Sequence, residues 1–125
     1  MDKWQAIHNF WNSFGIPAYD ENSVDTGENA PDLPYITYNA QTGALNQVLS
    51  LTASLWYEGS SWADISHKAD EIAEAIGTGY KIYTINDGFV WITRGQPFAQ
   101  RMSDPTNASI KRIYIMTNAE FLTAY

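Results

Sequence analysis

The chain contains no cysteine among its 125 residues. Disulfide frameworks and thiolate metal sites are therefore excluded, and the sequence is compatible with a reducing compartment. It also lacks any run approaching the roughly 20 consecutive apolar residues that span a bilayer. Residues 1–15 show no basic stretch followed by an apolar one, as a secretory signal would. We expect no membrane segment and synthesis in the cytosol.

Basic residues are scarce. Seven Lys and Arg stand against fourteen Asp and Glu, which gives a formal net charge of −7. Because non-specific nucleic-acid binding needs clustered Lys and Arg, this class of function is disfavoured. The apolar share is 45%, with five Trp and eight Tyr, so the chain is expected to fold around its own core. Residues 1–125 are predicted to form a single domain.

Two segments carry apolar residues at helical spacing. In the first, Asp2 fits an N-cap, and Gly15 with Pro17 supplies a stop. The second follows Ser61 and Asp64, which have the spacing of a capping box, and it ends at Gly77. The apolar stripes are Trp4, Ile7, Phe10, Trp11 and Phe14 in the first segment and Trp62, Ile65, Ala69, Ile72, Ala73 and Ile76 in the second.

The remaining apolar runs predict strands. Residues 34–40 and 47–57 are two of them, and in the longer one five apolar residues, from Leu49 to Tyr57, alternate with Ser and Thr. After the second helix, four more strands are predicted: two in a hairpin within 80–95, then 97–103 and 109–121, with a turn at Asp104 and Pro105. This order predicts an α+β domain, a mainly antiparallel sheet packed on one side by two amphipathic helices.

The hairpin, YKIYTINDGFVWITRG, is apolar on both faces. With a turn at Asp87 and Gly88, one face carries Tyr83, Ile85, Val90 and Ile92, and the other carries Tyr80, Ile82, Phe89 and Trp91. Two helices can cover one face, so the second needs another cover. We hypothesise that another subunit or a different protein packs there. The alternatives are one helix on each face, or the acidic loop folded over the hairpin.

Few groups of residues could support catalysis or metal binding, and we expect no catalytic residue, no metal and no cofactor. His67 has Asp64 and Glu71 at i−3 and i+4, but this side of the helix is opposite the apolar stripe and is expected to be solvated. His8 is expected to pack at the core boundary. Gly77 and Gly79 end a helix, so they cannot form a phosphate-binding loop.

Residues 17–34 are rich in Pro, Gly, Asn and acidic residues and predict a loop, apart from a short extended stretch near Ala18 and Tyr19. The part from 20 to 32 is here called the acidic segment. Paired catalytic carboxylates need rigid, partly buried positions, so we interpret these as surface charge. They are Asp20, Glu21, Asp25, Glu28 and Asp32.

Three tryptophans leave a carbohydrate-binding module open as a second class of function. Trp56, Trp62 and Trp91 could stack against sugar rings if they are exposed on the sheet. Trp62 also belongs to the apolar stripe of a helix, and aromatic residues are equally favoured as anchors of protein interfaces.

Five stretches of the chain, in order, resemble the tail terminator proteins, also called minor capsid or tail completion proteins, of long-tailed bacteriophages. They are FGIPAYDENSV, LPYITYNA, SLTASLWYEGSSWADISHKADEIAEAIG, GQPFAQRM and KRIYIMTNAEFLTAY. The resemblance covers most of the chain. It consists of turn, aromatic and packing residues, without a catalytic signature.

The resemblance implies a non-enzymatic virion protein, made in the bacterial cytoplasm and located in the tail–neck region. Such proteins form a ring, typically hexameric, which caps the tail tube at its head-proximal end and contacts the tail tube protein and a neck or stopper protein. DNA passes through the ring without specific binding, and a negative lumen would repel its phosphates. A head-closure stopper or adaptor, which also forms rings, is the alternative neck component.

Two groups of residues are the candidate contacts in such an assembly. We expect the hairpin residues and nearby basic residues to lie in a subunit or partner interface, and the acidic segment to be ordered by a partner. The interface candidates are Tyr80, Ile82, Phe89, Trp91, Arg94, Arg101, Lys111 and Arg112. The four basic residues could instead be surface residues that serve solubility.

Overall fold

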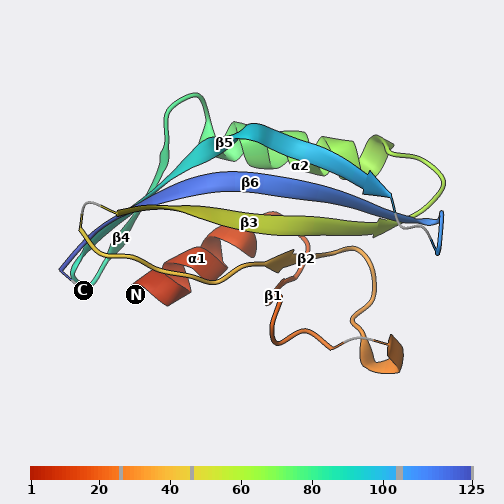
Figure 1. Cartoon of the computed structure of the whole chain (residues 1–125), viewed down its shortest axis with the longest axis horizontal. Coiled ribbons are helices and arrows are strands. Elements are labelled where there is room, and N and C mark those ends of the chain that lie inside the picture. The colour runs from red at the N-terminus through yellow and green to blue at the C-terminus, as the bar shows by residue number, and fades with distance from the viewer. Residues whose placement is uncertain (26, 46, 104–105, 125) are drawn as a thin grey trace.

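Six strands form one sheet in the order β1-β2-β3-β6-β5-β4 in the computed structural model, which describes residues 1–25, 27–45, 47–103 and 106–124 (Figure 1). β1 and β2 pair in parallel, and every other neighbouring pair is antiparallel. The strands are β1 (Ala18–Asp20), β2 (Tyr35–Tyr38), β3 (Gln47–Glu58), β4 (Lys81–Ile85), β5 (Gly88–Ser103) and β6 (Ile110–Thr123). The mainly antiparallel α+β fold is confirmed.

The two predicted helices are present as α1 (Lys3–Trp11) and α2 (Ala63–Ile76), and a short 3-10 helix, η1 (Gly27–Asn29), lies within the acidic segment. Asp2 caps α1: its carboxylate accepts a hydrogen bond from the Gln5 N–H at 2.8 Å, and the Gln5 side chain accepts one from the Asp2 N–H at 2.9 Å. Trp4 is 52% exposed, so its place on the buried stripe was wrong.

The capping box predicted for α2 was also wrong. The N-cap residue is Trp62, and its side chain makes no capping hydrogen bond. Ser61 precedes the cap and accepts a hydrogen bond from the Ala63 N–H at 3.0 Å, while Asp64 lies in the first turn. The spacing of Ser61 and Asp64 therefore located the start of the helix to within one residue and misassigned the cap.

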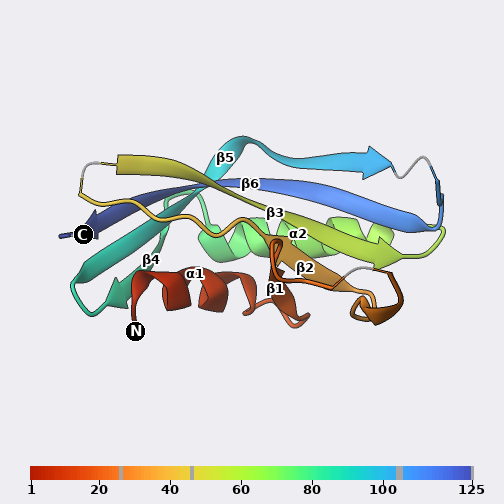
Figure 2. The ribbon, with the colours of Figure 1, turned by 60° about the horizontal axis from the view of Figure 1, so that its bottom comes forward.

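Both helices lie on one face of the sheet. In β6, every second residue from Ile113 to Thr123 is buried, and the apolar ones join the buried residues of α1 and α2 in one hydrophobic core. In Figure 1 α2 lies behind β5 and above β6 in the view, and Figure 2 shows α1 between β4 and the short strands β1 and β2. The alternative of one helix on each face was wrong, because both apolar stripes pack against the same side.

Two of the predicted strands are one. β5 runs through Gly95 and Pro97, which lie at the boundary between the predicted strands within 80–95 and at 97–103, and it pairs with β6 on both sides of them. The register shifts between Arg94, opposite Thr117, and Ala99, opposite Ile115. The intervening residues leave the ladder as an irregularity, after which pairing with the same strand resumes. The part of the chain after α2 therefore has three strands in the described residues, and the predicted turn at 104–105 lies outside them.

The hairpin turns at Asn86 and Asp87, one residue earlier than predicted, because Ile85 pairs with Gly88. Since both turns have two residues, each residue keeps its face although its partner changes. Tyr83, Ile85, Val90 and Ile92 accordingly face the helices, and Ile82, Phe89 and Trp91 face the other way. The division of the hairpin into these two faces is confirmed.

The pKa values of four tyrosine side chains allow a prediction of how stability changes at alkaline pH. Burial, as the largest cause, raises the pKa of the phenols of Tyr35, Tyr38, Tyr57 and Tyr83 above the ordinary value of 10.0. The unfolded chain then releases these protons at lower pH than the folded chain does, so the free energy of unfolding should fall as pH rises above about 10. Urea midpoints between pH 8 and 11 would measure this fall. A double variant, Tyr57→Phe with Tyr83→Phe, should show a shallower fall, and an unchanged slope would contradict the assignment.

Candidate interaction surface

The face of the sheet that points away from the helices is here called the open face. Among the described residues, α1, α2 and the strands leave it uncovered, and the acidic segment with η1 lies over one end of it. It is formed by alternate residues of β3, β6, β5 and β4, because successive side chains of a strand point to opposite faces. Its side chains include Val48, Thr52, Trp56, Ile82, Phe89, Trp91, Met102, Arg112, Tyr114, Met116, Asn118, Glu120 and Leu122. An exposed sheet face with this many large apolar side chains is typical of an interaction surface.

One end of the open face carries the hairpin patch, defined as Tyr80, Ile82, Phe89 and Trp91. Tyr80 stacks on Trp91 with the ring centroids 4.7 Å apart and the planes within 6°. Tyr80, Ile82 and Phe89 are 53%, 43% and 42% exposed. Trp91 is half-buried, and its indole N–H is buried without a hydrogen-bond partner in the described part of the chain. The sequence prediction that these residues share one uncovered surface agrees with this geometry.

At the other end of the open face, Arg112 is fixed among aromatic rings. Its guanidinium carbon lies 4.9 Å from the centroid of the Trp56 ring and 5.7 Å from that of Tyr114. Its Nε donates a hydrogen bond to Ser54 Oγ at 2.9 Å, and the Trp56 indole donates one to Thr37 Oγ1 at 2.9 Å. Stacking and hydrogen bonding together give this arginine a defined orientation on the sheet.

The acidic segment lies over the Arg112 end of the open face. Its residues Glu21 and Asp25 line a pocket of about 350 Å³ together with Tyr35, Trp56 and Arg112. Thr37 and Ser54, which point to the open face in this region, are buried. The hairpin patch stays exposed at the opposite end, so the alternative in which the acidic loop folds over the hairpin was wrong.

The four basic candidates do not form one group. The Arg101 guanidinium lies 5.1 Å and the Lys111 ammonium 5.5 Å from the Trp62 ring, so both gather at the start of α2. Arg101 also donates a hydrogen bond to Ser66 Oγ at 3.4 Å. Arg112 is on the open face, as described above. The four basic interface candidates therefore do not share one surface of the subunit.

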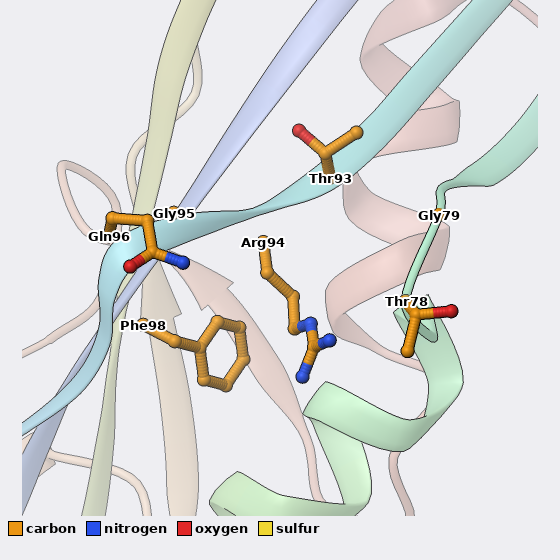
Figure 3. A pocket seen from close by; sticks show the side chains of 7 residues that line it. All are labelled: Thr78, Gly79, Thr93, Arg94, Gly95, Gln96 and Phe98. Atoms are coloured by element: carbon orange, nitrogen blue, oxygen red, sulfur yellow. The ribbon is translucent and has the colours of Figure 1, made fainter.

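Arg94 lies apart from the other three, in a shallow polar pocket of about 470 Å³ between β5 and the end of α2. Figure 3 shows its side chain extending between Phe98 and Thr78. Gly79 and Gln96 also line the pocket. The pocket brings one cation together with neutral polar groups, including the hydroxyls of Thr78 and Thr93, and no titratable base among the described residues lines it, so it suits recognition of a polar group better than catalysis.

The remaining candidates for chemistry are accounted for by ordinary contacts. His8 Nδ1 and the Tyr38 hydroxyl are hydrogen-bonded at 2.9 Å at the edge of the core. Glu71 forms an ion pair with Lys68 at 3.1 Å, on the solvent side of α2 beside His67. In the described ranges, no group of three or more His, Asp or Glu residues is arranged to hold a metal ion. Neither described helix is long and apolar enough to cross a membrane.

The three tryptophans of the carbohydrate alternative are separated. Trp56 and Trp91 are opposite Arg112 and Glu120 of β6, eight residues apart, which is about 26 Å along a strand. Trp62 is at the start of α2, between two cations. They therefore form no common platform on which one short sugar chain could stack.

Sequence comparisons add nothing to this picture. No family model matches the chain, and no curated protein matches its sequence.

Proposed function

We propose that the protein is a structural, non-enzymatic virion component that forms a ring, typically of six subunits, at the head-proximal end of a phage tail tube and joins the tube to the neck. The observation that carries this proposal is the open face with its exposed hairpin patch. The resemblance to tail terminator proteins supplies the kind of assembly in which such a surface is buried.

In the proposed ring, identical subunits associate head to tail, and each buries its hairpin patch against the neighbour. A heterologous contact of this kind uses two different surfaces of each subunit and ends polymerisation when the ring closes. Removal of the exposed side chains of Tyr80, Ile82 and Phe89 from water favours the contact, at about 25 cal/mol per Å² of apolar area. The ring then docks on the last layer of the tail tube protein and presents its other side to the neck or stopper protein.

Charge fits the passage of DNA through this ring. With a net charge of −7, the subunit offers few phosphate contacts, so DNA passes without being held. The acidic segment is the part of the chain that we expect a partner to hold in place. Its carboxylates are exposed or half-exposed in the isolated subunit, so they are accessible to such a partner.

Negative-stain electron microscopy tests the proposal. Purified protein at high concentration, alone and with tail tubes of the phage that carries the gene, should give six-fold top views and rings that cap tube ends. Monomers together with bare tube ends would contradict it and would favour a binding module. Rings that bind the connector side of the head and leave tubes bare would assign the protein to a stopper or adaptor instead.

A further inference from the structure

The outer edge of β5 is free over its second half. β4 pairs with β5 only as far as Ile92, whereas β5 continues to Ser103. In the part of the chain that the structure describes, no other strand pairs with this side of residues 95–103. These residues are exposed except for Gly95, which is buried, and Phe98, which is half-buried. An unpaired edge of this length is a template for another polypeptide segment.

The register of the sheet shows which strand forms the other edge at the level of the free half of β5. One row of paired residues runs from β1 to β5 through Ala18, Ile36, Leu55, Ile113 and Arg101. A second row runs through Asp20, Tyr38, Ala53, Ile115 and Ala99. β1 and the free half of β5 are therefore the two edges of the same part of the sheet. In a side-by-side arrangement of two copies in the same orientation, the β1 side of one would meet this free edge of the other.

On its outer side, β1 offers few free backbone groups to another strand. Its Ala18 N–H donates to Asn12 Oδ1 at 3.2 Å, and its Asp20 carbonyl accepts from Ser23 and Val24 at 2.9 and 3.1 Å. These two outward backbone groups of the three-residue strand are thus used within the chain. The contact on that side must be made by the residues that follow, which form the acidic segment.

The two sides have complementary charges. The acidic segment contains five carboxylates and no Lys or Arg. The free half of β5 carries Arg101, and Arg94 precedes it in the polar pocket. Arg94 also lines a pocket with Asp70 and Glu74 of α2, and Arg101 lines one with Asp70. Neither arginine forms a direct ion pair with a carboxylate of the described residues, and both side chains are exposed, so an acidic partner can reach them. Charge complementarity of this kind fixes partner and register more than it adds affinity.

We propose that the acidic segment of one copy docks along the free edge of β5 of the next copy, with carboxylates meeting Arg94 and Arg101. This inference rests on the proposed ring and names the partner of the acidic segment as the adjacent subunit. It supplies the two unlike surfaces that a head-to-tail contact requires, in addition to the hairpin patch. The same edge contact shields the longest free strand edge of the subunit.

Cysteine cross-linking tests this contact, because the natural chain has no thiol of its own. We would make Glu28→Cys and Gln100→Cys separately and together, and treat each with a short bismaleimide. The mixed single variants should give a cross-linked dimer, each alone should not, and the double variant should give a ladder that ends at the ring size. Lys81→Cys in place of Gln100→Cys is the matched control, since Lys81 is exposed on the edge strand at the other end of the sheet.

Charge exchange gives an independent readout. Arg101→Glu should raise the protein concentration needed for ring formation at least about tenfold, and adding Asp25→Lys with Glu28→Lys should restore it in part. Rings that form normally but yield no Glu28–Gln100 cross-link would overturn the edge contact and leave the proposed function standing. Failure of the unmodified protein to form rings or cap tubes would overturn both.

Discussion

Replacement of Gly88 with Ala is expected to lower the free energy of unfolding by about 3 kcal/mol. Gly88 has φ of 152°, a conformation that residues with a side chain rarely adopt. A Cβ at this position would lie 1.9 Å from the carbonyl oxygen of Leu122 in β6. The first residue of β5 would have to leave its pairing with Thr123, which would loosen the hairpin where it joins the sheet.

Urea denaturation followed by tryptophan fluorescence would measure this effect as a lower midpoint at an unchanged slope. Gly79→Ala is the matched control. Gly79 is also a glycine beside the hairpin, but an added Cβ there meets no heavy atom within 4 Å. Its midpoint should stay within error of the unmodified protein or rise slightly, because alanine restricts the unfolded chain. Equal midpoints for the two variants would show that β5 can shift at Gly88 without cost.

Local patterns were sufficient for the helices and for the faces of the strands. The alternation from Leu49 to Tyr57 correctly assigned one face of β3 to the core, and helical spacing found both helices. These patterns succeed because burial of one face imposes a period on neighbouring residues. The same reasoning divided the hairpin correctly even though its turn was displaced by one residue.

Features that depend on residues distant in sequence were not predicted. Gly95 and Pro97 are local signals for a break, yet β5 continues because both halves pair with β6. The contact of Arg112 with Trp56 arises from the pairing of β3 with β6, and no sequence pattern indicated that register. The free edge of β5 follows only from the sheet order, since it depends on where β4 ends. A list of basic residues could not show which cations share a surface.

Replacement of Trp91 with Ser is expected to leave the protein folded and to weaken subunit association by about 2 kcal/mol per contact, roughly 30-fold in Kd. Trp91 faces away from the helices and is half-buried, and on the open face it stacks with Tyr80. Loss of that stack should cost the isolated subunit only about 1 kcal/mol. In an interface, by contrast, a central tryptophan is a common anchor, and truncation leaves a gap against the partner.

Two measurements on the same samples separate these roles of Trp91: urea midpoints report the fold, and sedimentation with negative-stain imaging reports the ring. Trp4→Ser is the matched control, because Trp4 is 52% exposed on α1, away from the open face, and should alter neither. A Trp91→Ser protein that unfolds would make this side chain part of the core. A folded variant that still forms rings at the same concentration would remove the hairpin patch from the interface. A variant that stays folded but no longer forms rings would instead show that a neighbouring subunit covers the open face. In that case the half-exposed Trp91 side chain contributes more to association than to folding.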